Sequence, residues 1–267
     1  MLLDCRLIVD APAEGAWNMA VDEALLESAA DAGAATLRLY RWREPTLSLG
    51  YFQAHSDRAG HAPSASLPCV RRSTGGGALV HDREVTYSLT LPPAALAGRD
   101  TRALYCDAHR AVIAAIVEGS GADGARLSLC DPEKSPAAGE EPFLCFLRRS
   151  DGDLLVGPPH PAGEESGGVR GRHKVTGSAQ RKRRGALLQH GGVLLARSDA
   201  APELPGLLDL GLLTAGNEQK LIERLAERLP TALGLRVEAG ELTDGERHAA
   251  GRLVEEKHGH PAWVERR

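Results

Sequence analysis

The sequence predicts an α+β fold, because helical and strand-like segments are grouped along the chain instead of alternating as βαβ units. Apolar residues recur at helical spacing near the N-terminus, in the middle and near the C-terminus, and strand-like alternation lies between these segments. The 267 residues are 42 % hydrophobic and 25 % charged, which is ordinary for a globular protein. No apolar run is long enough to span a bilayer, so we expect no membrane association.

The first part of the chain predicts one helix followed by strands. The helix is indicated by apolar residues that share one face, namely Trp17, Ala20, Val21, Ala24 and Leu25. Residues 37–42 alternate in polarity, as a half-buried strand would. Residues 85–91 give the clearest strand, and Pro92 and Pro93 end it.

The second part returns to helix, strands and helix. Another helical face is formed by Leu104, Ala108, Ala111, Val112 and Ala115, with Gly119 near its end. Strands dominate residues 143–195, and residues 197–216 contain the prolines and glycines of a connector. A helical stripe follows over residues 222–233, and Thr243 with Glu246 forms a capping box that opens a last helix. We therefore expect a main domain over residues 1–215 and a small helical appendage over residues 216–267, which can pack on the same domain.

Two motifs carry most of the functional information. Residues 71–81 read RRSTGGGALVH, and their three glycines permit positive φ angles and close backbone approach. A flexible glycine turn beside a strand is the simpler interpretation of this motif alone. Residues 173–191 read HKVTGSAQRKRRGALLQHG and again combine a cation, small residues and a histidine followed by glycine.

Together the two motifs resemble the biotin/lipoate A/B protein ligase family, whose members attach lipoate or octanoate to lysines of carrier domains. Residues 18–24, 37–42 and 47–53, and Trp263 with Arg266 and Arg267, are also similar to family segments. The resemblance implies mixed, largely antiparallel sheets with flanking helices. It also implies an acyl-binding site formed by Arg72, Thr74, Gly75, Gly76, Gly77, His81, Gly177, Ser178, Ala179 and His190.

Cys145 distinguishes the branches of this family. A Cys-Phe pair upstream of an Asp-apolar strand (residues 153–156) and of Lys174 resembles the cysteine-dependent octanoyltransferases, whereas the simple ligases lack a cysteine at this point. The resemblance implies transfer of octanoyl from acyl carrier protein, through a thioester on Cys145, to a lysine of a lipoyl-accepting domain. A thiol attacks as thiolate, and the ammonium of Lys174 would favour the thiolate and stabilise the developing oxyanion. A buried structural cysteine is the competing interpretation.

Three other functions stay open. They are an ATP-dependent lipoate ligase in which Cys145 is incidental, an amidotransferase between carrier domains, and a non-catalytic protein that binds acyl groups or carriers. Transfer from a thioester requires no cofactor, whereas the ligase would require ATP and Mg²⁺. The glycines at 75–77 are not followed by the Gly-Lys-Ser/Thr of a Walker loop, but the family's ligases bind nucleotide without one.

The remaining cysteines and histidines give weaker signals. Cys5, Cys69, Cys106 and Cys130 form no C-x-x-C pair, so no metal site is expected, and only Cys69 is a rival nucleophile. The odd cysteine count and the lack of a signal-peptide pattern favour a reducing cytoplasm. No role is expected for the histidines on loops or polar faces, among them His55, His61, His109, His160, His258 and His260.

A basic run extends from Arg170 to Arg184 in a chain whose formal net charge is -4. Since no aromatic residues interleave the run, we expect acidic carrier proteins as partners and not nucleic acid. The family resemblance implies that acyl carrier protein is the donor of the octanoyl group. It also implies that the glycine cleavage H protein and the acyltransferase subunits of 2-oxoacid dehydrogenases accept this group. The long proline- and glycine-rich loop over residues 157–172 is expected to be a surface excursion or a lid.

Overall fold

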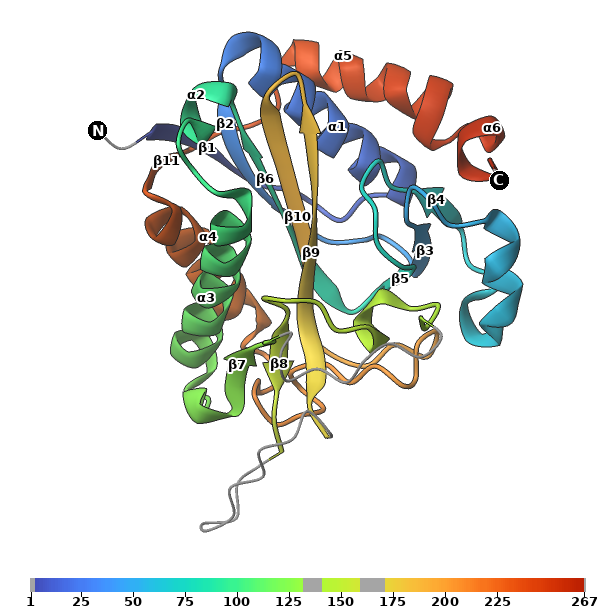
Figure 1. Cartoon of the computed structure of the whole chain (residues 1–267), viewed down its shortest axis with the longest axis vertical. Helices are drawn as coiled ribbons and strands as arrows, with labels where there is room; N and C mark the ends of the chain where they lie inside the picture. Colours follow the sequence, from blue (N-terminus) through green and yellow to red (C-terminus); the bar gives the residue numbers. More distant parts are fainter. Residues whose placement is uncertain (1–2, 132–140, 159–170, 267) are drawn as a thin grey trace.

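The computed structural model describes residues 3–131, 141–158 and 171–266, and it shows an α+β architecture around one large sheet (Figure 1). Its eight strands lie in the order β11-β1-β2-β6-β10-β9-β8-β7. They are β1 Leu3–Val9, β2 Ala35–Tyr40, β6 Glu84–Leu91, β7 Leu127–Leu129, β8 Leu154–Val156, β9 His173–Arg183, β10 Ala186–Leu194 and β11 Leu235–Ala239. β1 pairs in parallel with β2 and β11, and the other neighbours pair antiparallel. The predicted α+β class with largely antiparallel sheets is confirmed.

A smaller sheet contains the strands that flank the first motif. Its order is β4-β3-β5, with β3 at Thr46–Leu49, β4 at Cys69–Arg71 and β5 at Leu79–His81. β3 runs parallel to β4 and antiparallel to β5. The glycine-rich motif therefore leaves the end of one strand of this sheet and returns through another.

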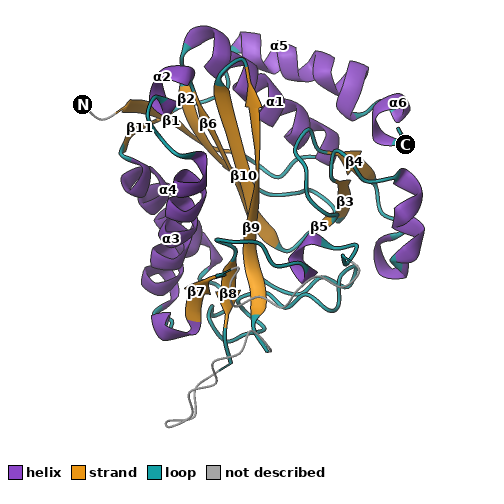
Figure 2. Ribbon diagram, in the orientation of Figure 1, coloured by secondary structure: helices purple, strands orange, loops and turns teal. Residues whose placement is uncertain are grey.

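Helices cover both faces of the large sheet (Figure 2). α1 (Gly15–Ala32) packs on one face, and α3 (Thr101–Ser120) and α4 (Glu218–Leu233) pack on the other. The short α2 (Pro93–Leu96) follows β6, while α5 (Asp244–Leu253), a π-helical turn (Val254–His258) and α6 (Pro261–Val264) complete the C-terminal end. Three of the helices, α1, α3 and α4, cover the segments that the apolar spacing predicts.

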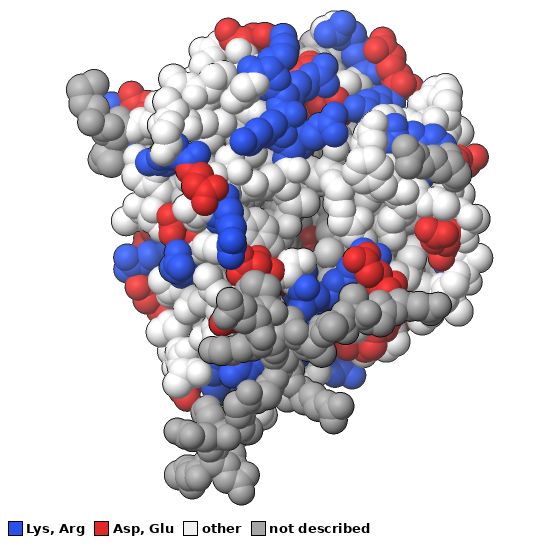
Figure 3. Space-filling model, in the orientation of Figure 1, with Lys and Arg blue, Asp and Glu red and all other residues white. Residues whose placement is uncertain are grey.

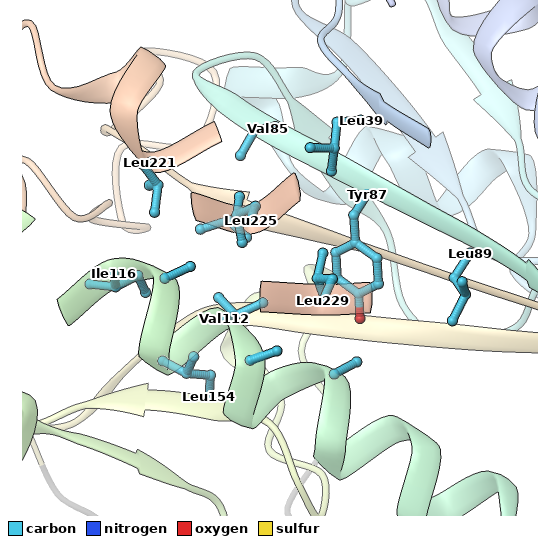
Figure 4. Packing of buried hydrophobic residues seen from close by; sticks show 14 of the residues in the cluster. Leu39, Val85, Tyr87, Leu89, Val112, Ile116, Leu154, Leu221, Leu225 and Leu229 are labelled. Carbon is cyan, nitrogen blue, oxygen red and sulfur yellow. The ribbon is translucent and has the colours of Figure 1, made fainter. Parts of the chain in front are cut away.

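The largest core lies between the sheet and the pair α3 and α4 (Figure 4). It contains Leu39, Val85, Tyr87 and Leu89 from the sheet, Val112 and Ile116 from α3, and Leu221, Leu225 and Leu229 from α4. A Cβ atom on Gly119 would lie 3.2 Å from the Cα of Leu221, so this glycine lets the two helices approach closely. The residue that ends α3 is Gly121, whose φ is 69°.

The strand at residues 37–42 is not half-buried as its alternation predicts. All six residues of β2 are buried, because α1 covers one face of the sheet and the main core covers the other. Arg38, one of the polar residues of the pattern, pairs with Asp22 of α1 at 3.0 Å and with Asp10, which directly follows β1, at 2.6 Å. Alternating polarity here reflects a buried ionic layer instead of solvent.

Two further predictions change in detail. Strands do not occupy the whole of residues 143–195, since Cys145–Leu147 forms a 3₁₀ turn and the first strand after it begins at Leu154. The C-terminal segment contains helices, but it also contributes β11, which the sequence pattern does not indicate, and β11 pairs with β1. The division near residue 215 stays a prediction. Residues 159–170 of the long loop lie outside the described residues.

The irregular and capped segments agree with expectation. Residues 197–216 are mostly turns, and Thr243 and Glu246 form the capping box of α5. Within the described ranges, no helix has the length and apolarity needed to cross a bilayer.

Candidate active site

A cavity with about 470 Å³ of empty space, including its open side, lies where the two sheets and the 3₁₀ turn meet. Residues of both motifs line it, namely Arg72, Gly75, Gly76, His81, Gly177, Ser178, Ala179 and His190, together with Cys145. The other predicted site residues lie one layer behind the wall. Lys174 contacts Cys145, Thr74 hydrogen-bonds His190, and the carbonyl of Gly77 accepts from Arg72.

Sequence reasoning missed part of the wall. Met19, Tyr40, Leu79, Thr86, Phe146, Gly191 and Gly192 also line the cavity. The glycine pair directly follows His190 and the phenylalanine directly follows Cys145, so both could have been found beside residues already singled out. Met19 and Tyr40 belong to a helix and a strand whose patterns indicate only burial, so no local signal separates them from core residues.

The glycine-rich motif is a packed turn and not a flexible linker. Gly76 has a φ of 93°, and a Cβ atom there would lie 3.9 Å from the Sγ of Cys145. A Cβ atom on Gly50 would lie 1.9 Å from the carbonyl oxygen of Gly76. Only glycine therefore allows the backbone at position 50 to lie so close to the glycine turn. Arg72 donates to the carbonyls of Gly75 and Gly77 at 3.3 and 2.8 Å and thereby holds the turn from inside.

Arg72 brings a second cation to the cavity. Its side chain is buried and donates to the hydroxyl and the carbonyl of Ser48 at 2.6 and 2.8 Å. Burial lowers the pKa of Arg72 to about 10, while the negative charges of a Cys145 thiolate and of Glu84 act in the opposite direction. The guanidinium therefore stays charged at neutral pH.

Cys145 opens the 3₁₀ turn and is held by the end of the glycine motif. Its amide donates to the carbonyl of Ala78 at 2.8 Å, and the amide of Ala78 donates to the carbonyl of Phe143 at 3.0 Å. The Nζ of Lys174 lies 3.9 Å from the Sγ and 3.4 Å from the carbonyl oxygen of Cys145. The thiol therefore reaches Lys174 of β9 from the 3₁₀ turn.

Lys174 owes its position to a bulge and to a glycine. The pairing of β8 with β9 shifts register between Leu154 and Leu155, which lie opposite Thr176 and Lys174. Such a bulge can re-aim a side chain. A Cβ atom on Gly177 would lie 2.3 Å from the Cε of Lys174, so the lysine stem lies across this glycine. The Lys-x-x-Gly spacing of the motif thus has a steric cause.

His81 and His190 each stand between a carboxylate and a hydroxyl. His81 Nδ1 lies 2.9 Å from Glu84 and its Nε2 lies 2.6 Å from the hydroxyl of Ser48. The Nδ1 of His190 lies 3.0 Å from Asp22, and its Nε2 lies 2.8 Å from the hydroxyl of Thr74. Since both nitrogens of each ring are engaged, the two histidines brace the cavity wall.

In each of these two hydrogen-bonded sets, the surroundings shift the pKa of one group. Burial lowers the pKa of His81, although Glu84 acts in the opposite direction, so His81 is neutral near pH 7. Burial alone would raise the pKa of Asp22, but the hydrogen bond from His190 and the charge of Arg38 hold it below its usual value. Asp22 is therefore a buried carboxylate held by His190, Arg38 and Tyr40.

Two histidines for which no role was expected are buried. His109 on α3 places its Nδ1 2.7 Å from the carbonyl of Gly152 and its Nε2 2.7 Å from the hydroxyl of Ser178. Burial lowers the pKa of His109 to about 4. His258 lies 2.8 Å from Glu23. The apolar stripe of α3 includes the position of His109, so its burial could have been found from helical spacing.

The rival thiol Cys69 lies outside the cavity wall, and burial raises its pKa. Burial also raises the pKa of Cys5 to about 11, as for a packed core thiol. In the three described ranges no group of three or more His, Cys, Asp or Glu side chains could hold a metal ion.

The basic run is partly neutralised within the molecule. Figure 3 shows Lys and Arg side chains gathered over the β9–β10 hairpin. Arg183 pairs with Glu23 and Glu27 at 3.2 and 2.9 Å, and Arg184 pairs with Asp31 at 2.7 Å. Arg181 instead donates to the carbonyl of Ser73 at 3.3 Å, next to the glycine turn. Arg170 lies outside the described residues.

Comparison with known proteins gives a consistent result. The model of the family described as "Lipoyl protein ligase A/B catalytic domain" matches residues 14–209. The octanoyltransferase LipM of Kyrpidia tusciae is 33 % identical, over 93 % of this chain and 94 % of that protein. The octanoyltransferase LipM of Symbiobacterium thermophilum is 30 % identical, over 97 % of each chain.

Solved structures share the fold at lower identity. The bi-partite lipoate protein ligase of Thermoplasma acidophilum superimposes with a TM-score of 0.70 at 18 % identity, over 98 % of this chain and 96 % of that chain. A lipoate-protein ligase A bound with ATP gives a TM-score of 0.69 at 19 % identity, over 98 % of this chain and 99 % of that chain. The α+β architecture described above is therefore the catalytic fold of these ligases.

Proposed function

Because this chain belongs to the lipoyl protein ligase A/B catalytic-domain family, we propose that it is an octanoyltransferase of lipoate biosynthesis that works through a thioester on Cys145. The donor is octanoyl-acyl carrier protein, and the acceptor is a lysine of a lipoyl-accepting domain in the cytoplasm, such as the glycine cleavage H protein or a 2-oxoacid dehydrogenase acyltransferase subunit. The observation that carries the proposal is the thiol of Cys145 in the cavity wall, 3.9 Å from the Nζ of Lys174.

The cavity floor offers a path for the acyl chain. Tyr40, Thr86, Gly192 and Gly177 are successive register partners on β2, β6, β10 and β9, so they form a row across the strands. Neighbouring strands are about 4.8 Å apart, which gives the row a span of about 14 Å. Gly192 and Gly177 add no side chain of their own to the row, although the stem of Lys174 lies across Gly177 and the carboxylate of Glu84 lies against Gly192. An extended medium-length acyl chain can lie there, with its carbonyl at Cys145 and its tail toward the buried Tyr40.

The first half-reaction forms the acyl-enzyme. The Cys145 thiolate attacks the carbonyl carbon of the donor thioester, and the resulting oxyanion develops beside the ammonium of Lys174. Collapse of the tetrahedral intermediate breaks the donor C–S bond, and the departing carrier thiolate takes up a proton. The thioester is already an activated acyl group, so this route requires neither ATP nor Mg²⁺.

The second half-reaction forms the amide. The neutral amine of the acceptor lysine attacks the Cys145 thioester, and the same cation stabilises the second oxyanion. Collapse breaks the bond between the acyl carbon and Sγ, returns Cys145 to the thiolate, and releases the extra amine proton to solvent. An amide N–C bond has replaced the enzyme thioester.

The acyl-enzyme is directly testable by intact mass. Octanoyl-acyl carrier protein should add one octanoyl group to the enzyme, and hydroxylamine should remove it. Cys145→Ala should prevent this addition, whereas Cys69→Ala, which removes the rival thiol, should leave it unchanged. An adduct that persists in Cys145→Ala would contradict the proposal.

A choice of donors separates the related activities. An apo lipoyl domain is offered octanoyl-acyl carrier protein, an octanoylated carrier domain, or octanoate and lipoate with ATP and Mg²⁺. We expect modification from the acyl carrier protein thioester without ATP. Modification only from free acid with ATP would establish a ligase. Modification only from the octanoylated carrier domain would establish an amidotransferase, and no modification would leave a binding protein.

A further inference from the structure

We propose that Asp153 is a positioning residue for the transfer reaction, which aims the ammonium of Lys174 at Cys145 and is itself fixed by Tyr105 of α3. The inference rests on the proposed function, since it concerns the thiol that function uses. It adds a buried carboxylate and a helix on the far side of the sheet to the machinery of the site.

The carboxylate of Asp153 is held at both oxygens. Oδ2 accepts from the Nζ of Lys174 at 2.8 Å and from the amide of Ser150 at 2.7 Å, while Oδ1 accepts from the hydroxyl of Tyr105 at 2.8 Å. Asp153 is 1 % exposed. A carboxylate pinned in this way cannot rotate without breaking a buried hydrogen bond, so it presents one fixed acceptor to the lysine.

That fixed acceptor determines where the lysine's remaining protons point. An ammonium has three N–H donors. One is directed to Asp153, and the other near neighbours of Nζ are the carbonyl oxygen and the Sγ of Cys145, at 3.4 and 3.9 Å. The ring of Phe146 lies 5.4 Å away. Anchoring one donor therefore leaves the others facing the reacting sulfur.

The same contact stabilises the charge of Lys174. The lysine is 4 % exposed, and a buried ammonium without a counter-ion favours the neutral amine. A neutral amine would stabilise neither a thiolate nor an oxyanion. The buried carboxylate of Glu84 lies against Gly192, the register partner of Gly177, and is engaged by His81 and Thr86. Two cations also lie nearby, namely Arg149, whose pKa burial lowers while the charge of Asp153 opposes this, and Arg72 in the cavity wall. Neither can replace the carboxylate.

α3 fixes Asp153 from behind. Tyr105 and His109 lie one helical turn apart, and they bind the side chain of Asp153 and the preceding carbonyl of Gly152. The amide of Ser178 donates to the Tyr105 hydroxyl at 3.2 Å. Burial and the charge of Asp153 raise the pKa of Tyr105 far above its usual value, so its hydroxyl remains a donor. The helix thus joins the Asp153 turn to the Gly-Ser-Ala segment of the cavity wall.

The test measures the thiol directly. Iodoacetamide alkylation of Cys145 is followed by peptide mass across pH for the wild type, Asp153→Asn, Lys174→Met and the double variant. We expect Asp153→Asn to move the alkylation profile to higher pH, in the direction of Lys174→Met, and to lower the rate of octanoyl transfer by about 10²-fold, as for loss of an oxyanion donor. KM for the carriers should change little, and the double variant should resemble Lys174→Met alone.

Matched variants distinguish a positioning role of Asp153 from a general structural effect of changing it. Asp153→Glu should recover part of the wild-type profile, and Tyr105→Phe should shift it by less than Asp153→Asn. The control is Asp151→Asn, which removes a nearby carboxylate that pairs with Arg102 and should leave the profile unchanged.

An unchanged alkylation profile in folded Asp153→Asn, or a shift that adds fully to that of Lys174→Met, would overturn the proposal. Because alkylation needs no acyl donor, an incorrect donor or acceptor would abolish turnover without altering these profiles.

Discussion

Three glycines shape the candidate site, each for a different steric reason. Gly50 leaves room for the carbonyl oxygen of Gly76, and Gly177 leaves room for the stem of Lys174. Gly76 adopts a φ of 93°, a region that residues with a Cβ atom rarely enter. A glycine-rich sequence is usually associated with flexibility, but these glycines permit close packing around one thiol.

Gly76→Val should therefore give a folded protein with little acyl-enzyme. The left-handed conformation costs a residue with a side chain about 1–2 kcal/mol, and the new methyl groups point toward Arg72 and Cys145. Intact mass after incubation with octanoyl-acyl carrier protein measures the loss, and thermal unfolding measures stability. Gly60→Val is the control, because a side chain there meets nothing within 4 Å. Wild-type acylation of Gly76→Val would favour a flexible linker.

His109 predicts a loss of stability in mildly acidic solution. Its pKa is about 4 in the folded protein against an ordinary value of 6.5, so the unfolded chain binds a proton that the folded chain excludes between these values. The contribution of neutral His109 to the free energy of unfolding is fully present above pH 6.5. It is lost as the pH decreases toward 4, by about 3 kcal/mol for 2.5 pH units. Urea unfolding at several pH values should show a flatter dependence for His109→Gln.

If the free energy of unfolding changed equally with pH in the wild type and in His109→Gln, that assignment would be contradicted.

Glu23 contributes to stability in a lower pH range. Burial would raise its pKa, but hydrogen bonds from His258 and Lys257 lower it to about 2, so its contribution is present above pH 4.5 and is lost as the pH falls toward 2. The two groups can be separated by the pH range in which each acts.

At the scale of elements, the C-terminal end is attached to the rest of the chain through buried ionic and polar contacts. Glu23 of α1 accepts from Lys257 at 2.6 and 2.7 Å, next to His258. The buried guanidinium of Arg71 donates to the carbonyls of Trp263 and Val264. Because Arg71 ends β4, where the glycine motif begins, the C-terminal helix braces the strand that carries the motif.

Thr243→Ala should weaken α5 without affecting the thiol. Thr243 accepts from the amide of Glu246 at 3.2 Å, and the carboxylate of Glu246 accepts from the amide of Thr243 at 2.8 Å. Loss of such a cap costs about 1 kcal/mol. Denaturant unfolding should show this decrease, while Cys145 alkylation stays at the wild-type rate. The control Thr214→Ala changes an exposed threonine in a turn, and equal stability of the two variants would argue against the cap.

At the scale of the whole molecule, the two sheets and the helices on each side create a cavity that no single element contains. α1 supplies Met19, the large sheet supplies the floor, and the small sheet and its glycine turn supply a wall. The hairpin of β9 and β10 extends past the neighbouring strands to one end of the molecule (Figure 1), and Lys and Arg side chains gather over it (Figure 3). The family resemblance implies acidic carrier proteins, whose approach the remaining positive charge of the hairpin would favour.

Lys182→Glu and Lys220→Glu make the same change of charge at different places. Lys182 lies on the exposed end of the β9–β10 hairpin. Lys220 lies on α4, which packs on the face of the large sheet opposite α1. We expect Lys182→Glu to lower kcat/KM for octanoyl-acyl carrier protein several-fold at low salt, with the difference decreasing at high salt. Lys220→Glu should behave as wild type, and a small octanoyl thioester should not distinguish the variants. Equal losses in both variants would indicate an effect of net charge alone.

The sequence by itself determined the fold class, most helices, the family and most of the cavity wall. Helical periodicity and helix capping depend on residues only a few positions apart. For this reason α1, α3, α4 and the start of α5 could be predicted from the sequence. The two motifs contain side chains whose chemistry can be inferred without a structure. Lys174 lies in the second motif, whereas Cys145 was identified through its resemblance to the cysteine-dependent octanoyltransferases, and the structure places the two 3.9 Å apart.

Only the tertiary structure decided which polar residues are buried and what they contact. The pairing of β11 with β1 joins segments over two hundred residues apart, and burial of both faces of β2 depends on helices elsewhere in the chain. The sequence marks Asp153 only as the start of a strand and His109 only as part of a helical stripe, yet these residues and Tyr105 converge behind Lys174. The physical reason is that a pattern records whether a residue prefers burial, whereas its partner is set by the packing of distant segments.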